Sequence, residues 1–190
     1  MTSEQRLFQQ PWPEGELRFF QLGFLVGDIL RAAERWVGVH GVGPFHVLPR
    51  REVACTYRGE QTKLDLQVAV AQAGPVQIEL IEQFCDRASV YRELSEKGES
   101  RFHQVCTMTQ DYDGKRTHYE RLGYELVSEM SAGSGRVGFY DTLRDFGFFT
   151  EVAEYTPTFL AHLTTIAQTC ASWDGTDPVR LLTRDGYRTP

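Results

Sequence analysis

The sequence RFFQLGFLVGD at residues 18–28 decides the fold, because its pattern returns 83 residues later as RFHQVCTMTQD at residues 101–111. The two stretches share Arg, Phe, Gln and Asp at matching positions, so that Gln21 aligns with Gln104. A period of this length indicates a duplicated structural unit. We therefore expect the chain to contain two copies of one unit.

Each copy begins with a strand that is followed by a helix. Residues 19–26 alternate between two faces in the way that a strand does. Asp28 and Asp111 then stand where helix N-caps are expected, and apolar residues at helical spacing follow both of them. The same offset places Trp36 of the first helix on Tyr119 of the second. Each half thus opens with the same order of strand, cap and helix.

The two halves also end alike, in a glycine followed by a β-rich run that contains Glu-x-x-Glu. These runs are GPVQIELIEQ, from residue 74, and GFFTEVAEY, from residue 147. Further strands are expected between the opening and closing elements, so each half is a βαβββ unit and the fold class is α+β. The expected inner strands are residues 45–55 and 64–71 in the first half, and 124–130 and 136–141 in the second.

The chain divides into segments on this basis. A polar connector, with room for a short helix, joins the two units, and an amphipathic helix at residues 158–171 follows the second. The tail from Trp173 to Pro190 carries no motif and is expected to be a surface extension. The predicted boundaries are 18–83 for the first unit, 84–100 for the connector, 101–156 for the second unit and 157–190 for the helix and tail.

Length and charge limit the classes of function. The 190 residues suffice for one compact domain or two fused halves, and 20 basic against 26 acidic side chains give a net charge of −6. This charge offers no general attraction to nucleic acid or to an anionic membrane. No apolar stretch approaches the roughly 20 residues that cross a bilayer, and the N-terminal sequence lacks the order of a signal peptide. A cytoplasmic location with reduced cysteines is expected.

The paired units resemble the vicinal oxygen chelate superfamily, which includes glyoxalases and methylmalonyl-CoA epimerases. The resemblance spans residues 18–156 and rests on FQLGFLVGDI, VQIELIEQ, RFHQVCTMTQDYD and GFYDTLRDFGFFTEVAEY in this order and spacing. It implies that the two units pair into an incomplete mixed β-barrel around one cavity, the glyoxalase/bleomycin-resistance/dioxygenase-like fold. In such a barrel each first strand and each last strand contributes one residue to a divalent-metal site.

Carried over by the resemblance, the metal positions fall on Gln21, Glu79, Gln104 and Glu151. The superfamily generally has His in place of Gln104 and commonly has His in place of Gln21. Two amide and two carboxylate oxygens suit Mg²⁺, Mn²⁺ or Ca²⁺ better than metals that prefer imidazole, and neutral amides bind metals weakly. One hypothesis is therefore a site for one divalent metal, and the other is a site that has lost its metal.

In the metal-free case, Glu79 and Glu151 are expected to have raised pKa values in a partly apolar cavity, with one protonated while the other is ionised. Such a pair suits acid and base catalysis. Gln21 and Gln104 would then bind substrate, or simply form hydrogen bonds across the sheet. The glutamates expected to face the other way and to be solvated are Glu82 and Glu154.

His103 is a further candidate for the catalytic base, and the alternative is a structural histidine. One step along the strand from Gln104 turns the side chain of His103 to the opposite face unless the strand contains a bulge. Tyr140 and Phe149 are aromatic candidates for substrate contact within a set that mostly belongs to the core. The histidines expected at the surface are His40, His46, His118 and His162.

The resemblance supplies a reaction class, namely an isomerase, epimerase or lyase that moves a proton next to a carbonyl of a small organic substrate. Glu79 or Glu151 would be the base and the other the acid or a metal ligand. The alternative is a non-catalytic protein that binds and sequesters a small molecule, which the loss of both His positions favours and the retention of both Glu positions disfavours. A ring-cleaving dioxygenase is disfavoured because ferrous iron prefers two His and one carboxylate. A homodimer is expected, as relatives often form one.

Overall fold

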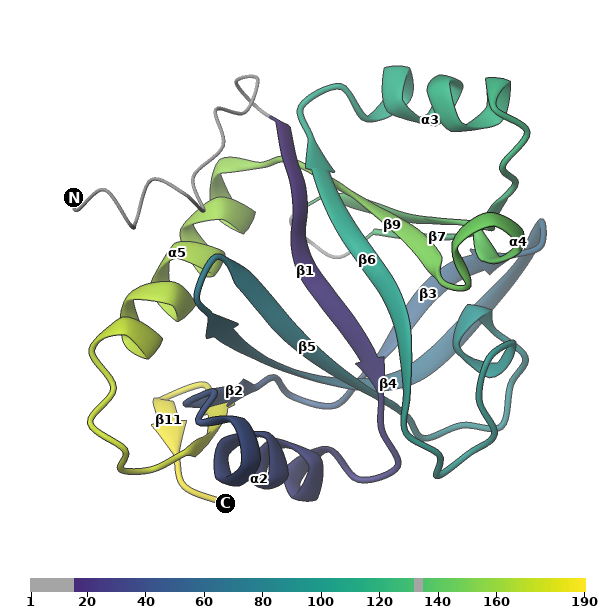
Figure 1. Cartoon of the computed structure of the whole chain (residues 1–190). Helices are drawn as coiled ribbons and strands as arrows, with labels where there is room; N and C mark the ends of the chain where they lie inside the picture. Colours follow the sequence, from purple (N-terminus) through teal and green to yellow (C-terminus); the bar gives the residue numbers. More distant parts are fainter. Residues whose placement is uncertain (1–15, 132–134) are drawn as a thin grey trace.

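Strands β1 (Glu16–Leu25) and β6 (Arg101–Thr109) contain the two copies of the repeated stretch and lie side by side at the centre of the molecule (Figure 1). They pair antiparallel, so the two copies run past one another in opposite directions. The structure is a computed structural model, and it describes residues 16–131 and 135–190. This central pair joins the two units.

Within the described residues, eight strands form a hydrogen-bonded ring. Besides β1 and β6, the ring contains β3 (Arg51–Tyr57), β4 (Glu60–Ala73), β5 (Val76–Gln83), β7 (Leu126–Ser131), β8 (Arg136–Tyr140) and β9 (Phe149–Glu154). In each unit the last strand runs parallel beside the first, and the middle strands continue the sheet antiparallel. A short pairing of β3 with β7 links the units a second time. This arrangement confirms the predicted α+β fold of two βαβββ units around a mixed barrel.

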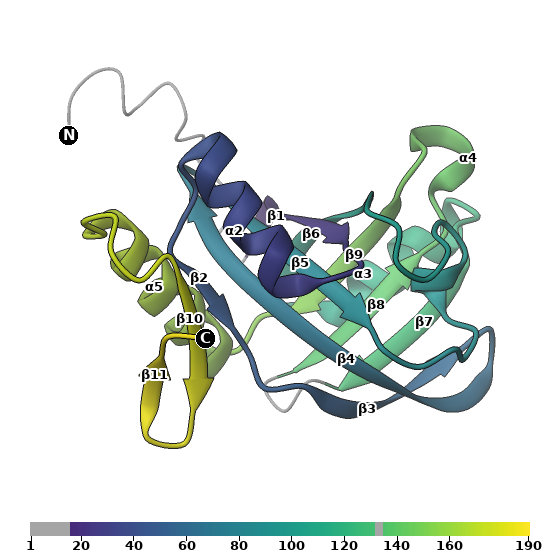
Figure 2. The ribbon, with the colours of Figure 1, turned by 90° about the horizontal axis from the view of Figure 1, so that it is seen from below.

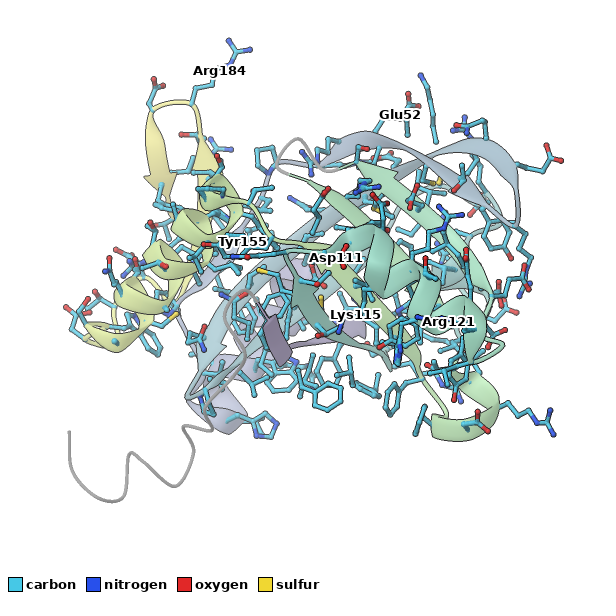
Figure 3. The ribbon with its side chains drawn as sticks, turned by 90° about the horizontal axis from the view of Figure 1, so that it is seen from above. Glu52, Asp111, Lys115, Arg121, Tyr155 and Arg184 are labelled. Carbon is cyan, nitrogen blue, oxygen red and sulfur yellow. The ribbon has the colours of Figure 1, made fainter. Side chains whose placement is uncertain are left out.

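One helix follows the first strand of each unit, as predicted. The helices are α2 (Ile29–His40) and α3 (Tyr112–Arg121), and α2 covers the outer face of the sheet near β5 (Figure 2). The Asp28 carboxylate accepts a hydrogen bond from the backbone N–H of Arg31, and Asp111 caps α3 in the same way (Figure 3). Both predicted N-caps are therefore confirmed.

The aligned aromatic residues fix the two helices to the barrel. Trp36 packs edge-on against Phe24 of β1 with ring centroids 5.1 Å apart, and Tyr119 stacks on Tyr140 of β8 at 4.5 Å. Phe24 faces the core under α2, whereas its neighbour Leu25 faces the barrel interior. The alternation in the sequence thus separates an inner core from two outer ones.

The strand predicted at residues 45–55 is interrupted in the structure. β2 (Phe45–Val47) pairs with the C-terminal part of β4, whereas β3 begins at Arg51 and pairs with its N-terminal part. Pro49 lies in the break, where its missing N–H and fixed backbone angle prevent a continuous ladder. The single predicted strand is therefore two short ones.

The C-terminal region adds structure that the sequence did not reveal. The predicted helix is α5 (Pro157–Ala171), but the tail is more than a surface extension, because it forms a hairpin of β10 (Val179–Thr183) and β11 (Gly186–Arg188). β10 pairs parallel with β2 and buries Val179, and Arg184 lies at the hairpin turn (Figure 3). The remaining short elements are η1 (Val90–Arg92) in the connector and α4 (Leu143–Phe146).

Two of the histidines expected at the surface lie inside. His46 of β2 is fully buried, and His162 of α5 is half-buried and faces the barrel cavity. Burial lowers the pKa of both rings, which favours their neutral forms. The four cysteines are free. No helix in the described parts of the chain has the length and apolar character needed to span a membrane.

Candidate active site

Strand register brings the predicted site residues together around a glycine. Glu79 of β5 lies opposite Gly23 of β1, and Gln104 of β6 lies opposite the same glycine on its other side. Glu151 comes from β9, which runs parallel beside β6. A Cβ atom at Gly23 would overlap the amide of Gln104. The glycine therefore lets the Gln104 side chain cross β1 and reach the carboxyl group of Glu79.

The amide of Gln104 connects the two carboxyl groups. Its Nε2 atom donates to Oε2 of Glu79 and to Oε2 of Glu151, each at 3.0 Å. Gln104 and Glu151 are buried, and Glu79 is partly exposed. One amide, with its two N–H bonds, thus holds carboxyl groups from both units in a single cluster.

A bulge in β6 adds His103 to this cluster. Gly23 pairs with Gln104, but the next residue of β1 pairs with Phe102, so His103 is an extra residue in its strand. The ring is fully buried. Its Nδ1 atom contacts Oε1 of Gln104, and its Nε2 atom lies 3.1 Å from the carbonyl oxygen of Val90. The alternation that would have turned His103 away is therefore broken at this one position.

Burial raises the pKa of both carboxyl groups, and the charge of Glu151 raises the pKa of Glu79 further. Desolvation raises the pKa of Glu151 to about 7. The pKa of Glu79 is raised well above its usual range by desolvation and then by the charge of Glu151. Burial lowers the pKa of His103 to about 4, so this ring is neutral near pH 7. The carboxyl pair therefore retains a proton at a pH where exposed glutamates are fully ionised.

The two carboxyl groups open onto a cavity of about 370 Å³ whose walls are mostly aliphatic and aromatic. Gln21 lines the same cavity, and its Nε2 atom donates to Oε1 of the buried Gln77 at 3.4 Å. Strands of both units and helix α5 contribute the walls. Gln21, Glu79 and Glu151 thus face one cavity, and Gln104 lies behind the two glutamates.

Known proteins share this architecture. The family model described as the Glyoxalase/Bleomycin resistance protein/Dioxygenase superfamily matches residues 20–140. The chain belongs to this superfamily. Methylmalonyl-CoA epimerase from Mycobacterium tuberculosis is similar in structure, with a TM-score of 0.54 and 16% sequence identity, covering 82% of this chain and 99% of that one.

A hypothetical protein from Bacillus halodurans C-125 is also similar, with a TM-score of 0.53 and 15% identity, covering 75% of this chain and 96% of that one. At such low identity these likenesses show the fold of the superfamily and leave the reaction to the site itself. No curated protein sequence matches the chain.

Members of the glyoxalase superfamily often hold a divalent metal at these positions, but the side chains of this chain do not fit one as they are arranged. Neutral amide oxygens are weak metal ligands, and the Gln104 side chain already contacts both carboxyl groups and His103, so it would have to leave these partners to bind a metal. In addition, residues 16–131 and 135–190 contain no group of three or more His, Cys, Asp or Glu side chains that is placed to hold a metal.

The two aromatic residues predicted to contact substrate do not line the cavity. Tyr140 is fully buried in the outer core beneath α3, and Phe149 is fully buried with its ring centroid 5.1 Å from that of His103. Phe139 lines the cavity instead of its neighbour Tyr140, because alternate residues of β8 face opposite sides.

The outward-facing glutamates have structural partners. Glu82 accepts a hydrogen bond from the backbone N–H of Ile29 at 2.9 Å, at the start of α2. Glu154 forms an ion pair with Arg136 at 3.0 Å. Both face away from the cavity, as predicted, but neither is simply solvated.

Sequence reasoning missed two neighbours of the cluster, and it left a third, Tyr91, between a contact for a substrate carboxylate or phosphate and a surface residue. Gln77 lies two residues before Glu79, and Cys106 lies two residues after Gln104, so alternation along the strand was an available signal for both. Tyr91 comes from η1 in the connector, for which no strand pattern exists. It lines the cavity, and burial together with the charges of the two glutamates raises the pKa of its phenol.

Proposed function

We propose that this chain is an isomerase, epimerase or lyase that moves a proton at a carbon next to a carbonyl group. The observation that carries the proposal is the pair of the buried Glu151 and the partly buried Glu79, joined through one amide beside a largely apolar cavity. A carboxyl group whose pKa lies near the working pH is suited to both accept and return a proton. A protein that only binds an apolar ligand gains nothing from withdrawing two such groups from water.

In this mechanism the ionised carboxyl group removes the proton and the protonated one returns a proton. The Gln104 amide can adjust to the position of the proton, because its N–H₂ and its oxygen can exchange places between the carboxyl pair and His103. Nε2–H of His103 donates to the carbonyl of Val90, because a carbonyl only accepts, so a neutral ring leaves Nδ1 as an acceptor. With the amide N–H₂ turned to Nδ1, Oε1 faces the pair and accepts from the protonated carboxyl group. The opposite orientation donates to both carboxyl groups but sets Oε1 against the acceptor Nδ1.

The developing negative charge on the substrate oxygen also needs a hydrogen-bond donor. Gln21 supplies an amide N–H₂ on the cavity wall, held by Gln77. This role differs from that of Gln104, which contacts the acid and base rather than the substrate. Of the two aligned glutamines, Gln21 would then contact the substrate and Gln104 would contact the acid and the base.

Exchange of solvent deuterium into candidate carbonyl compounds, followed by NMR, tests the proposal. We expect exchange catalysed by the wild type, loss of it in Glu79→Gln, and no change in Glu52→Gln, an exposed carboxylate on β3 (Figure 3). Activity should survive a chelator; loss on chelation and recovery with Mn²⁺ would instead support the metal hypothesis. Tight ligand binding with no exchange into any compound would replace catalysis by sequestration.

We also propose a cytoplasmic homodimer. Free cysteines are typical of a reducing compartment. Large apolar side chains are exposed on the surface, among them Phe19, Val39, Leu122 and Phe146. Sedimentation velocity at micromolar concentration should give the mass of a dimer, and a monomer there would contradict the proposal.

A further inference from the structure

Helix α5 forms a roof over the cavity. Near its N-terminal end, the ring of Phe159 packs edge-on against Phe20 of β1 with centroids 6.3 Å apart. Near its C-terminal end, Sγ of Cys170 accepts a hydrogen bond from the backbone N–H of Gln72 in β4 at 3.2 Å. The helix is thus fixed to two different strands of the barrel (Figure 1). The α5 residues that line the cavity between or beside these anchors are Thr158, Phe159, His162, Leu163 and Ile166.

The roof changes what the cavity can admit. Leu163 and Ile166 are buried, so this part of the helix packs inward rather than standing clear of the barrel. The cavity volume of about 370 Å³ lies near the lower end of the range of roughly 300–1,000 Å³ for small-molecule pockets. A compact ligand fills such a space, whereas a long flexible arm would extend out of it and need binding groups at its rim.

Polar groups lie at separate places on these walls. The carboxyl pair lies on the barrel strands, and His162 faces the cavity from the roof. Within the described residues, no hydrogen bond to a protein atom satisfies the ring of His162, and burial lowers its pKa, so it offers one donor and one acceptor to a ligand. Among the lining residues in the described part of the chain, the exposed Arg51 is the only permanently cationic side chain. One arginine is a poor match for a carrier with several phosphates.

We infer that the cavity takes a compact carbonyl compound with an apolar ring or branched body and one hydrogen-bonding group that meets His162, rather than an acyl group on a long phosphate-bearing thioester arm. This inference rests on the proposed proton transfer for the carbonyl end of the ligand. His162 is then a specificity-determining residue supplied by the C-terminal region, outside the segment that the family model matches.

Bicyclic ketones test the inference by binding, independently of turnover. The probes are 2-tetralone, its ring-hydroxylated isomers and propionyl-CoA, titrated calorimetrically into the full chain. We expect the tetralones to bind, with at least one hydroxylated isomer about tenfold tighter than the parent, the effect of one hydrogen bond. Propionyl-CoA should bind more weakly than any of them.

Variants of α5 separate the roof from the rest of the site. His162→Leu should abolish the preference for the hydroxylated isomer while leaving the affinity for 2-tetralone within about twofold, and His162→Gln should keep part of it. Gln168→Leu, at an exposed position of the same helix, is the matched control and should change neither affinity. The affinity of His162→Leu for 2-tetralone also reports on folding. If this variant were misfolded, it would lose affinity for 2-tetralone as well as the preference for the hydroxylated isomer.

The outcomes distinguish this inference from the proposed reaction. If the tetralones bind with the His162-dependent preference but exchange no deuterium, the result would support the inferred substrate class and contradict the proposed proton transfer. Exchange into propionyl-CoA, with tighter binding of it than of the tetralones, would overturn the substrate class and leave the proton transfer standing. A hydroxyl preference that persists in His162→Leu would also overturn the role of His162.

Discussion

The two units of the barrel share a backbone but place different side chains at equivalent positions. In the first unit Gln21 turns to Gln77 and is followed by Gly23. In the second unit Gln104 crosses that glycine to reach both carboxyl groups, with His103 inserted beside it. Duplication therefore explains why two glutamates lie close together. The differences between the units explain why only one amide, that of Gln104, contacts both of them. An asymmetric cluster suits a reaction in which the acid and the base are different groups.

Replacing each glutamate tests whether the two units contribute equally. Glu79→Gln and Glu151→Gln should each reduce the rate of deuterium exchange by about 10²–10⁴-fold, because each removes a group that transfers a proton but preserves its shape. The measurement is exchange by NMR, with circular dichroism as the control for folding. Full activity in one of the two variants would reduce the mechanism to a single carboxyl group and end the comparison between units.

Gly23 of β1 allows a more specific test of the difference between the two units. Gly23→Ala places a methyl group where the Gln104 amide crosses, so we expect displacement of that amide and a loss of exchange of about 10²-fold. Cys106→Ala alters the equivalent position of the second unit; it removes a buried thiol that hydrogen-bonds to Glu151 but leaves the path of the Gln104 amide unchanged, so its effect should stay below about tenfold. Equal losses in both variants would show that the crossing of Gln104 over β1 has no special role.

Much of the fold and part of the site followed from the sequence, because both depend on local alternation. The strand pattern of residues 19–26 and its second copy fixed which faces point inward, and with them the places of Gln21 and Glu79. The N-caps at Asp28 and Asp111 could also be predicted from local sequence, because a capping side chain bonds to the backbone within the first turn of its helix.

The rest of the site depends on how neighbouring strands pair, and the sequence of a single strand does not reveal that pairing. The bulge at His103 exists only relative to the pairing with β1, so alternation along β6 alone pointed the ring the wrong way. The inward face of β8 was misassigned by one position, which exchanged Phe139 for Tyr140. The inward face of α5 was predictable, but that His162 faces a cavity required the tertiary structure.

The pH dependence of stability compares the carboxyl cluster with the rest of the protein. A raised folded-state pKa stabilises the fold below the usual value of 4.5, and this stability is lost as pH rises through the folded value, about 7 for Glu151. Glu151→Gln cannot ionise, so at pH 8 it should be more stable than the wild type by on the order of 3 kcal/mol, and nearly equal at pH 4.5. Urea denaturation at the two pH values measures this.

His103 titrates in the opposite sense, because its lowered pKa destabilises the fold at acid pH, but the ring is present in both proteins and its contribution cancels in the comparison. The same stabilisation of Glu151→Gln at both pH values would show that the gain comes from packing. No gain at pH 8 would show that the pair keeps its proton or is solvated there.

The smallest expected effect concerns the two aligned helices, where the units differ in how firmly each helix is held. α2 buries Ile29 and Ala33 in addition to its contact through Trp36, whereas α3 relies on Tyr112 and on the stack of Tyr119. Trp36→Ala and Tyr119→Ala should each cost about 1–2 kcal/mol, as expected for half-buried aromatic residues, and leave deuterium exchange within about twofold of wild type. Amide hydrogen exchange should show α3 losing more of its protection than α2, because fewer contacts remain to hold it. Loss of turnover in either variant would mean that the outer helices transmit strain to the carboxyl cluster, and the barrel interior would then not be the independent unit that its packing suggests.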